Sequence, residues 1–189
     1  MATNITDRKL IEEELQHARL KAEQLADTDA LTGLNNRRAF FNLGKQLLHQ
    51  AERNLTPVAL IMFDLDYFKQ INDRYGHALG DETLVSIARV TEGQIRSSDV
   101  LARLGGEEFG ILMPQATLEQ ALTLAERLSQ AFFKNKIVHS KGQITCTASF
   151  GVSALEVVAT KTLDSLIAEA DKALYVAKNN GRNQIRAAN

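Results

Sequence analysis

Three acidic residues near the middle of the chain follow segments that could hold them rigidly enough for metal chemistry. Asp64 follows the apolar run 58–63, and Glu107 and Glu108 follow a pair of glycines. Mg²⁺ prefers one or two carboxylates together with phosphate oxygens and water. Asp64 and Glu107, on neighbouring strands, would supply such a pair. The alternative is that these are ordinary acids at strand ends that face solvent.

The glycine pair Gly105 and Gly106 affects both the backbone and the space beside these acids. Without side chains, the two residues allow a bulky ligand to approach the backbone. They also accept positive φ freely, so a pair of them between two strand-like runs predicts a hairpin turn. We expect its arms over 100–104 and 107–113. On its own, the pair is also compatible with an ordinary hairpin.

Helices and strands alternate around these acids. The run 58–63 is short and rich in strand-forming residues, which predicts a central strand buried on both faces. Asn35 or Asn36 can cap the helix that precedes it. After the strand we expect a short helix over 68–74 and a longer helix that follows Asp81.

The second half of the chain carries clear signals for starts and stops. Thr117 and Gln120 are the two ends of a capping box, which begins a helix reaching about Phe133. Three further elements are predicted: a strand over 144–153, a helix over 163–177 that Gly181 ends, and a short strand over 184–186. This order predicts an α+β sandwich of the ferredoxin-like type, with a mainly antiparallel central sheet flanked by helices.

The first 26 residues differ from the rest, because their apolar side chains follow a heptad spacing. These side chains are Ile11, Leu15, Ala18, Ala22 and Leu25. The spacing predicts an N-terminal helix that pairs two copies as a parallel coiled coil, and the alternative is a single amphipathic helix lying on its own domain. We therefore divide the chain into a coiled-coil helix over 1–26 and a folded domain over 27–189.

The composition limits where the protein works and what it binds. The 189 residues carry a net charge of −1, so no overall positive field would attract nucleic acid. No apolar run approaches the roughly 18 residues that span a bilayer, and the N-terminus lacks a signal peptide. The single cysteine, Cys146, permits no internal disulfide, and we expect a buried, unreactive thiol. We therefore expect a cytoplasmic protein without direct membrane contact, or the cytoplasmic part of a membrane-associated sensor.

Five blocks in order along the chain resemble the GGDEF family, the diguanylate cyclases. The block 105–109, Gly-Gly-Glu-Glu-Phe, is similar to the family signature in its glutamate variant. Together the blocks are far more specific than one pentapeptide, and the resemblance covers about Asp27 to the C-terminus. The other four blocks are 29–38, 63–73, 75–81 and 177–183.

The resemblance implies a nucleotidyl-cyclase-like fold and a nucleotidyltransferase reaction, in which two GTP molecules condense into cyclic di-GMP and release pyrophosphate. The ribose 3′-hydroxyl of one GTP attacks the α-phosphorus of the other, and Mg²⁺ (with Mn²⁺ as a substitute) assists. By resemblance, Asp64, Glu107 and the Leu65 carbonyl bind the metal. Glu108 supports the metal site or takes part in proton removal.

Substrate contacts also follow from the resemblance. Asn72 and Asp81 recognise guanine, although either could instead cap a helix or close a turn. Lys178 and Arg182 lie four residues apart and bind the β- and γ-phosphates. Their alternative role is to offset the dipole at a helix end. The remaining expected contacts are the backbone of Tyr67, Phe68 and Lys69, the glycines Gly105 and Gly106, and His77, to which no particular role is assigned.

A second ligand site is implied shortly before the glycine pair. Arg96 and Asp99 form the Arg-x-x-Asp pattern of the family's inhibitory site, where the product binds, and Arg127 matches its supporting arginine. Arginine can recognise guanine and phosphate in a bidentate manner. An exposed Arg–Asp ion pair is the alternative.

The reaction requires two copies of the domain, because each copy binds one GTP. We therefore expect a homodimer whose sites face each other across a two-fold axis. Segment 4–15 resembles the link that leaves a PAS sensor domain in bacterial signalling proteins, so we expect a sensor upstream. One alternative is a catalytically silent receptor for cyclic di-GMP or GTP. Another is a generic ferredoxin-like interaction domain, which leaves the five blocks unexplained.

Overall fold

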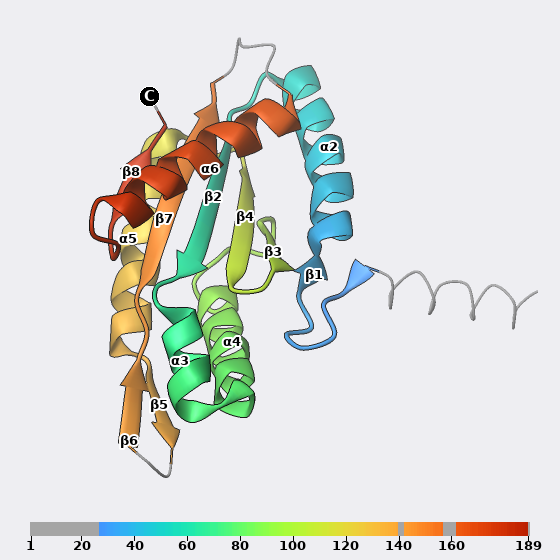
Figure 1. Cartoon of the computed structure of the whole chain (residues 1–189). Helices are drawn as coiled ribbons and strands as arrows, with labels where there is room; N and C mark the ends of the chain where they lie inside the picture. Colours follow the sequence, from blue (N-terminus) through green and yellow to red (C-terminus); the bar gives the residue numbers. More distant parts are fainter. Residues whose placement is uncertain (1–26, 140–141, 157–161, 189) are drawn as a thin grey trace, which may run out of the picture.

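The computed structural model describes residues 27–139, 142–156 and 162–188, which form an α+β domain around one six-stranded sheet (Figure 1). In spatial order the strands are β1 (Asn35–Asn36), β3 (Val100–Gly105), β4 (Glu108–Pro114), β2 (Val58–Leu65), β7 (Ala148–Leu155) and β8 (Ile185–Ala187). The four inner strands are antiparallel, and the edge strands β1 and β8 are parallel to their neighbours. The predicted fold class is confirmed, with a mixed sheet. The predicted coiled-coil helix over 1–26 lies outside the described residues.

Helices cover both faces of this sheet (Figure 1). The helices are α2 (Arg37–Asn54) and α6 (Leu163–Asn179) on one face, and α3 (Phe68–Tyr75), α4 (His77–Glu92) and α5 (Leu118–Lys134) on the other. Along the chain, β2, two helices, β3, β4, α5 and β7 follow the ferredoxin-like order that was predicted. In the described part of the chain, no helix is long and apolar enough to cross a membrane.

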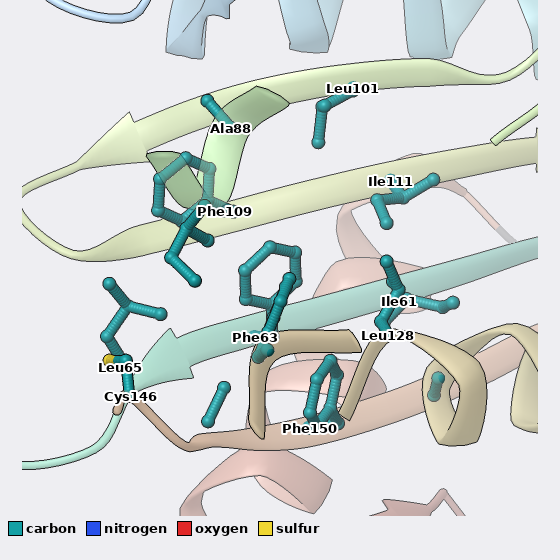
Figure 2. Packing of buried hydrophobic residues seen from close by; sticks show 14 of the residues in the cluster. Ile61, Phe63, Leu65, Ala88, Leu101, Phe109, Ile111, Leu128, Cys146 and Phe150 are labelled. Atoms are coloured by element: carbon teal, nitrogen blue, oxygen red, sulfur yellow. The ribbon is translucent and has the colours of Figure 1, made fainter. Parts of the chain in front are cut away.

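Strand β2 forms the centre of both apolar layers, because successive side chains of a strand point to opposite faces. Ile61 and Phe63 pack with α4 and α5, while the alternating residues such as Leu60 and Met62 pack with α2 and α6. Figure 2 shows the first of these clusters, in which the rings of Phe63 and Phe109 stack with centroids 5.0 Å apart. All residues of β2 are buried, including Asp64. A tightly packed strand therefore carries this acid to the end of the sheet.

Helix α6 packs closely against β7 at Gly151. A Cβ atom there would overlap the backbone of Ala170 and Leu174, so this approach requires a residue without a side chain. On the same strand, the buried Ser153 hydroxyl donates a hydrogen bond of 2.8 Å to the Leu166 carbonyl. These contacts fix the helix whose last turn carries Lys178.

Of the two caps predicted for the first helix, Asn35 or Asn36, the structure has Asn36, and the helix start predicted at Thr117 is confirmed. The Asn36 side chain accepts a hydrogen bond of 3.0 Å from the Ala39 N–H at the start of α2. At α5, Thr117 and Gln120 bond reciprocally as a complete capping box. These starts were predictable because a cap depends on residues close together in sequence.

The single strand expected over 144–153 is wrong. β6 (Gly142–Thr145) pairs with β5 (Lys136–His139) in a separate two-stranded sheet, and β7 begins only at Ala148. The reason is that β2 ends at Leu65, so the chain before Ala148 has no strand of the main sheet beside it, and β6 pairs with β5 instead. Cys146 lies between the two strands and is buried, as expected. Burial raises the pKa of its thiol to about 12.

Two boundaries near the acids also differ from the prediction. Helix α4 begins at His77 after Gly76, so Asp81 lies inside the helix and is not its N-cap. In the hairpin, Gly105 pairs with Glu108, which leaves Gly106 and Glu107 as the turn residues. The φ angles of Gly105 and Gly106 are 148° and 52°, values that side chains disfavour. The turn is therefore one residue later than expected, and Glu107 lies within it.

Candidate active site

The three predicted acids lie together where β2 ends and β4 begins. Asp64 is directly opposite Glu108 in the antiparallel pair, so their side chains share one face. Beside them, the Leu65 N–H donates a hydrogen bond of 3.3 Å to the Glu107 carbonyl. The charges of Glu107 and Glu108 both raise the pKa of Asp64, which indicates that the three carboxylates share one electrostatic environment. The structure thus gathers acids that lie more than forty residues apart in the sequence.

Asp64 combines burial with a cationic partner. Its residue is 8% exposed, and this burial is the main reason why its pKa rises to about 6. The Lys178 ammonium lies 2.8 Å from Asp64 Oδ2 and acts in the opposite direction, lowering this pKa. The acid therefore sits at the boundary between the core and an ionic site, a position typical of functional groups.

The donor set fits a magnesium ion. Among the described residues, no group of three or more His, Cys, Asp or Glu side chains could hold a metal ion on its own. Mg²⁺ does not need one, because it is bound by one or two carboxylates with water and substrate phosphates completing the shell. Asp64 and Glu107 can supply the carboxylates. Leu65 follows Asp64 and is hydrogen-bonded to the backbone of Glu107, so its carbonyl is a further candidate ligand.

The two predicted phosphate-binding cations converge on the same end of the sheet, but not along one helix. Lys178 lies in the last turn of α6, while Arg182 follows the helix end at Asn180 and has φ of 60°. The four-residue spacing therefore does not align them as expected for a continuous helix. Instead the Arg182 guanidinium lies over the Tyr67 ring, 4.8 Å from its centroid. Tertiary contacts rather than helical spacing bring the cations together.

The two candidate guanine-binding residues lie near each other, where α3 and α4 pack together. Asn72 is half-buried on α3, and its side-chain oxygen occupies the space that a Cβ on Gly80 would need. Asp81 is the next residue on α4 and is exposed. An amide and an exposed carboxylate thus lie on adjoining helices, and Gly80 allows the two helices to come this close.

The other expected substrate contacts lie around the start of α3. Tyr67 is the residue before the helix, and Phe68 and Lys69 begin it. The N–H groups of a first helical turn have no partner within the helix, so those of Phe68 and Lys69 can serve a phosphate. His77 is the first residue of α4 and is exposed. The structure gives it no evident role.

The three residues of the predicted inhibitory site line one cavity of about 180 Å³. The Arg96 N–H donates a hydrogen bond of 2.9 Å to Asp99 Oδ2, while Asp99 Oδ1 is buried without a hydrogen-bond partner among the described residues. Arg127 reaches from α5 and donates to the Gln94 carbonyl. A neighbouring cavity of about 500 Å³ also includes Arg96 and Asp99. An unpaired carboxylate oxygen beside exposed guanidinium groups suits a ligand that donates hydrogen bonds.

Sequence reasoning missed the contacts that support the turn carrying Glu107. Arg103 donates through Nε to the Gly106 carbonyl at 2.8 Å, and its Nη1 pairs with both carboxylate oxygens of Asp29. Burial alone would raise the pKa of Asp29, but hydrogen bonds from Thr32 and the guanidinium of Arg103 hold it below its ordinary value. Asp29 lies in the first matched block, but its partner is 74 residues away. No local signal could have paired them.

A family model for "Diguanylate cyclase, GGDEF domain" matches residues 26–184. The chain therefore belongs to the GGDEF family of diguanylate cyclases. The solved structure of the coiled coil and GGDEF domain of DgcB from Caulobacter crescentus, in complex with c-di-GMP, matches with a TM-score of 0.91. It is 28% identical and covers 98% of each chain.

Curated relatives share more sequence but are longer proteins. Diguanylate cyclase DgcM of Escherichia coli K12 is 41% identical over 187 residues, which is 98% of this chain and 42% of the relative. The response regulator PleD of Caulobacter vibrioides is 38% identical over 164 residues, 86% of this chain and 36% of the relative. The chain thus spans less than half the length of these relatives.

Proposed function

We propose that this domain condenses two molecules of GTP into cyclic di-GMP and releases two molecules of pyrophosphate. The observation that carries the proposal is the acid cluster of Asp64, Glu107 and Glu108 beside Lys178. Acids that can hold Mg²⁺ next to cations that can bind phosphate are the two requirements of phosphoryl transfer. The relatives that are named diguanylate cyclases support the same reaction.

The guanine and the phosphates of GTP bind at opposite ends of the proposed site. Asn72 and Asp81 hold the guanine edge through an amide and a carboxylate, while Lys178 and Arg182 bind the β- and γ-phosphates. Bound by Asp64 and Glu107, Mg²⁺ would polarise the α-phosphoryl group and favour ionisation of the attacking 3′-hydroxyl. The cations offset the charge that develops on the departing pyrophosphate. Glu108 lies opposite Asp64 and is placed to support the acid site or accept a proton.

Two copies must face each other for the reaction to go to completion. In each step a 3′-oxygen of one nucleotide bonds to the α-phosphorus of the other, and the bond to pyrophosphate breaks. One domain supplies one nucleotide, so we propose a homodimer with two-fold symmetry. We also propose that residues 1–26 promote this pairing and connect to an upstream sensor.

The cavity around Arg96, Asp99 and Arg127 supports product feedback. The guanine N–H groups of cyclic di-GMP can donate hydrogen bonds to Asp99 Oδ1, which has no partner among the described residues. Its phosphates can bind Arg96 and Arg127, which line the same cavity. The same cavity favours a second candidate function, a silent receptor for cyclic di-GMP. The two candidates differ in whether the acid cluster turns over GTP.

Incubation with GTP and Mg²⁺, followed by chromatography of the products, tests the proposed reaction. Wild type should form cyclic di-GMP and pyrophosphate. Glu107→Gln should lower the rate by about a hundredfold or more with the fold retained, because one metal-binding carboxylate is lost. Glu126→Gln, at an exposed acid on α5, is the matched control and should keep the wild-type rate. If wild type formed no product at any protein concentration, the proposed reaction would be wrong and the receptor function would remain.

A further inference from the structure

Asp66 is a buried acid that the proposed reaction does not use. It is 5% exposed and lies between β2 and α3, two residues after Asp64. Its Oδ1 accepts a hydrogen bond of 2.7 Å from the Ser149 hydroxyl. Its Oδ2 accepts bonds of 2.8 Å from the Thr147 hydroxyl and 3.0 Å from the Asn183 N–H. Both carboxylate oxygens are therefore engaged by the protein itself.

The loop that Asp66 contacts has an unusual backbone. Gly181, Arg182 and Asn183 have successive φ angles of 102°, 60° and 45°. Residues with side chains rarely adopt this left-handed region, and they keep it only where surrounding contacts hold them there. On the α6 side, the Arg182 N–H donates to the Ala177 carbonyl. The bond from the Asn183 N–H to Asp66 joins the same loop to the end of β2.

The side chain of Arg182 in this loop also has a contact beside Asp66. Tyr67 directly follows Asp66, and the Arg182 guanidinium lies over the Tyr67 ring at 4.8 Å from its centroid. Asp66 thus fixes the loop backbone while Tyr67 contacts the cation itself. Because Asp64 is on the same short segment, the distance between the acid cluster and Arg182 depends on this double attachment.

We propose that Asp66 is a positioning residue, which holds the Arg182 loop against the strand that carries Asp64. This inference rests on the proposed function, because it assigns Arg182 to the phosphates of GTP. Asp66 itself does not touch the nucleotide. The competing role is that of a further metal-binding carboxylate, and the engagement of both its oxygens by Ser149, Thr147 and Asn183 opposes it.

The chemistry of an amide separates these two roles. In Asp66→Asn, the amide oxygen can accept from Thr147 and Asn183, while its NH₂ group donates to the Ser149 hydroxyl, which can also accept. The attachment of the loop therefore survives the loss of charge. In Asp66→Ala, no acceptor remains for the Asn183 N–H. Ser149→Ala is the matched control, because it removes one bond of Asp66 and leaves the loop attached.

The test measures binding of GTP and of GMP by calorimetry in EDTA, where no turnover occurs. Asp66→Ala should weaken GTP binding about tenfold or more, as expected for loss of a charged hydrogen bond that orders the loop, and leave GMP binding nearly unchanged. Asp66→Asn and Ser149→Ala should bind GTP within about threefold of wild type, and Asp66→Asn should also retain turnover with Mg²⁺.

Several results would overturn the proposal. Equal loss of GTP and GMP binding in Asp66→Ala would show that the residue does not act through the phosphate contacts. Loss of turnover in a folded Asp66→Asn that still binds GTP would indicate a metal-binding role, and this result does not require Asp66→Ala to fold. A wild type that binds GTP but forms no product contradicts only the proposed reaction, whereas one that binds no GTP contradicts both.

Discussion

The burial of Asp64 lowers the stability of the folded domain at neutral pH. Burial raises the pKa of its carboxyl from an ordinary value of 3.8 to about 6, even though Lys178 lies beside it. The folded protein therefore holds this proton up to higher pH than the unfolded chain does. Stability must then decrease as pH rises from about 4 to about 6, where the folded form is forced to ionise.

Asp64→Asn should remove this penalty. The amide keeps a hydrogen-bond acceptor for Lys178 without a buried charge, so in EDTA the variant should be more stable than wild type above pH 6, by at most about 3 kcal/mol. The difference should shrink as pH falls towards 4. Urea unfolding at several pH values measures it, with Asp171→Asn, at an exposed acid of α6, as control. A constant difference across this range would contradict the assigned cause.

At the second site, Arg96 is the residue whose removal should separate feedback from catalysis. Arg96→Ala should weaken inhibition by added cyclic di-GMP about tenfold or more, because a guanidinium that can bind the ligand is lost. The initial rate in the absence of product should stay the same, since Arg96 does not belong to the acid cluster. Initial rates at increasing product concentration provide the measurement. Unchanged inhibition would indicate that the product acts elsewhere.

Among the elements, the hairpin of β3 and β4 depends on a contact from outside itself. Its turn contains Glu107, and Arg103 fixes the turn by binding the Gly106 carbonyl and Asp29 together. A hairpin with two positive-φ glycines has many available conformations, so its own backbone does not define where Glu107 points. The segment after residue 26 thereby takes part in shaping the acid cluster.

Arg103→Met should therefore impair both the turn and the stability of the domain. We expect turnover to fall about tenfold and the free energy of unfolding to fall by about 1–3 kcal/mol, because Asp29 loses its cation and Gly106 loses its donor. Asp29→Asn is the matched variant and should lose less turnover, since Arg103 can still hold Gly106. Equal turnover in wild type and Arg103→Met would show that the turn needs no such support.

For the molecule as a whole, the limiting event should be the meeting of two domains. In the proposed function each domain offers one acid cluster and binds one nucleotide, whereas cyclic di-GMP contains two bonds between two nucleotides. The rate per domain should therefore rise with protein concentration until dimers predominate. Product formation over a wide dilution series provides the measurement.

Deletion of residues 1–26 should shift this concentration dependence. If the heptad segment pairs two chains, the shortened protein should be slower at low concentration and approach the rate of the full chain at high concentration. The domain over 27–188 keeps its described core, so the comparison concerns pairing rather than folding. Equal rates at every dilution would exclude a role for the segment in pairing.

Several features were predictable because they depend on local spacing. The central strand over 58–63, the cap at Asn36 and the capping box at Thr117 all involve residues within a few positions of one another, and the structure contains each of them. The break between β6 and β7 was not predictable, since it occurs where β2 ends. Asp81 resembled a cap by type, but its place inside α4 depends on how α3 and α4 join.

The sequence by itself determined the family, the fold class and the residues available for chemistry, because the order of apolar runs and the five matched blocks are properties of the chain. Only the tertiary structure decided which of these residues meet. The opposition of Asp64 and Glu108, the approach of Lys178, and the attachment of Arg182 through Asp66 and Tyr67 join segments far apart in sequence. The physical reason is that such contacts depend on sheet register and helix packing, which no local pattern encodes.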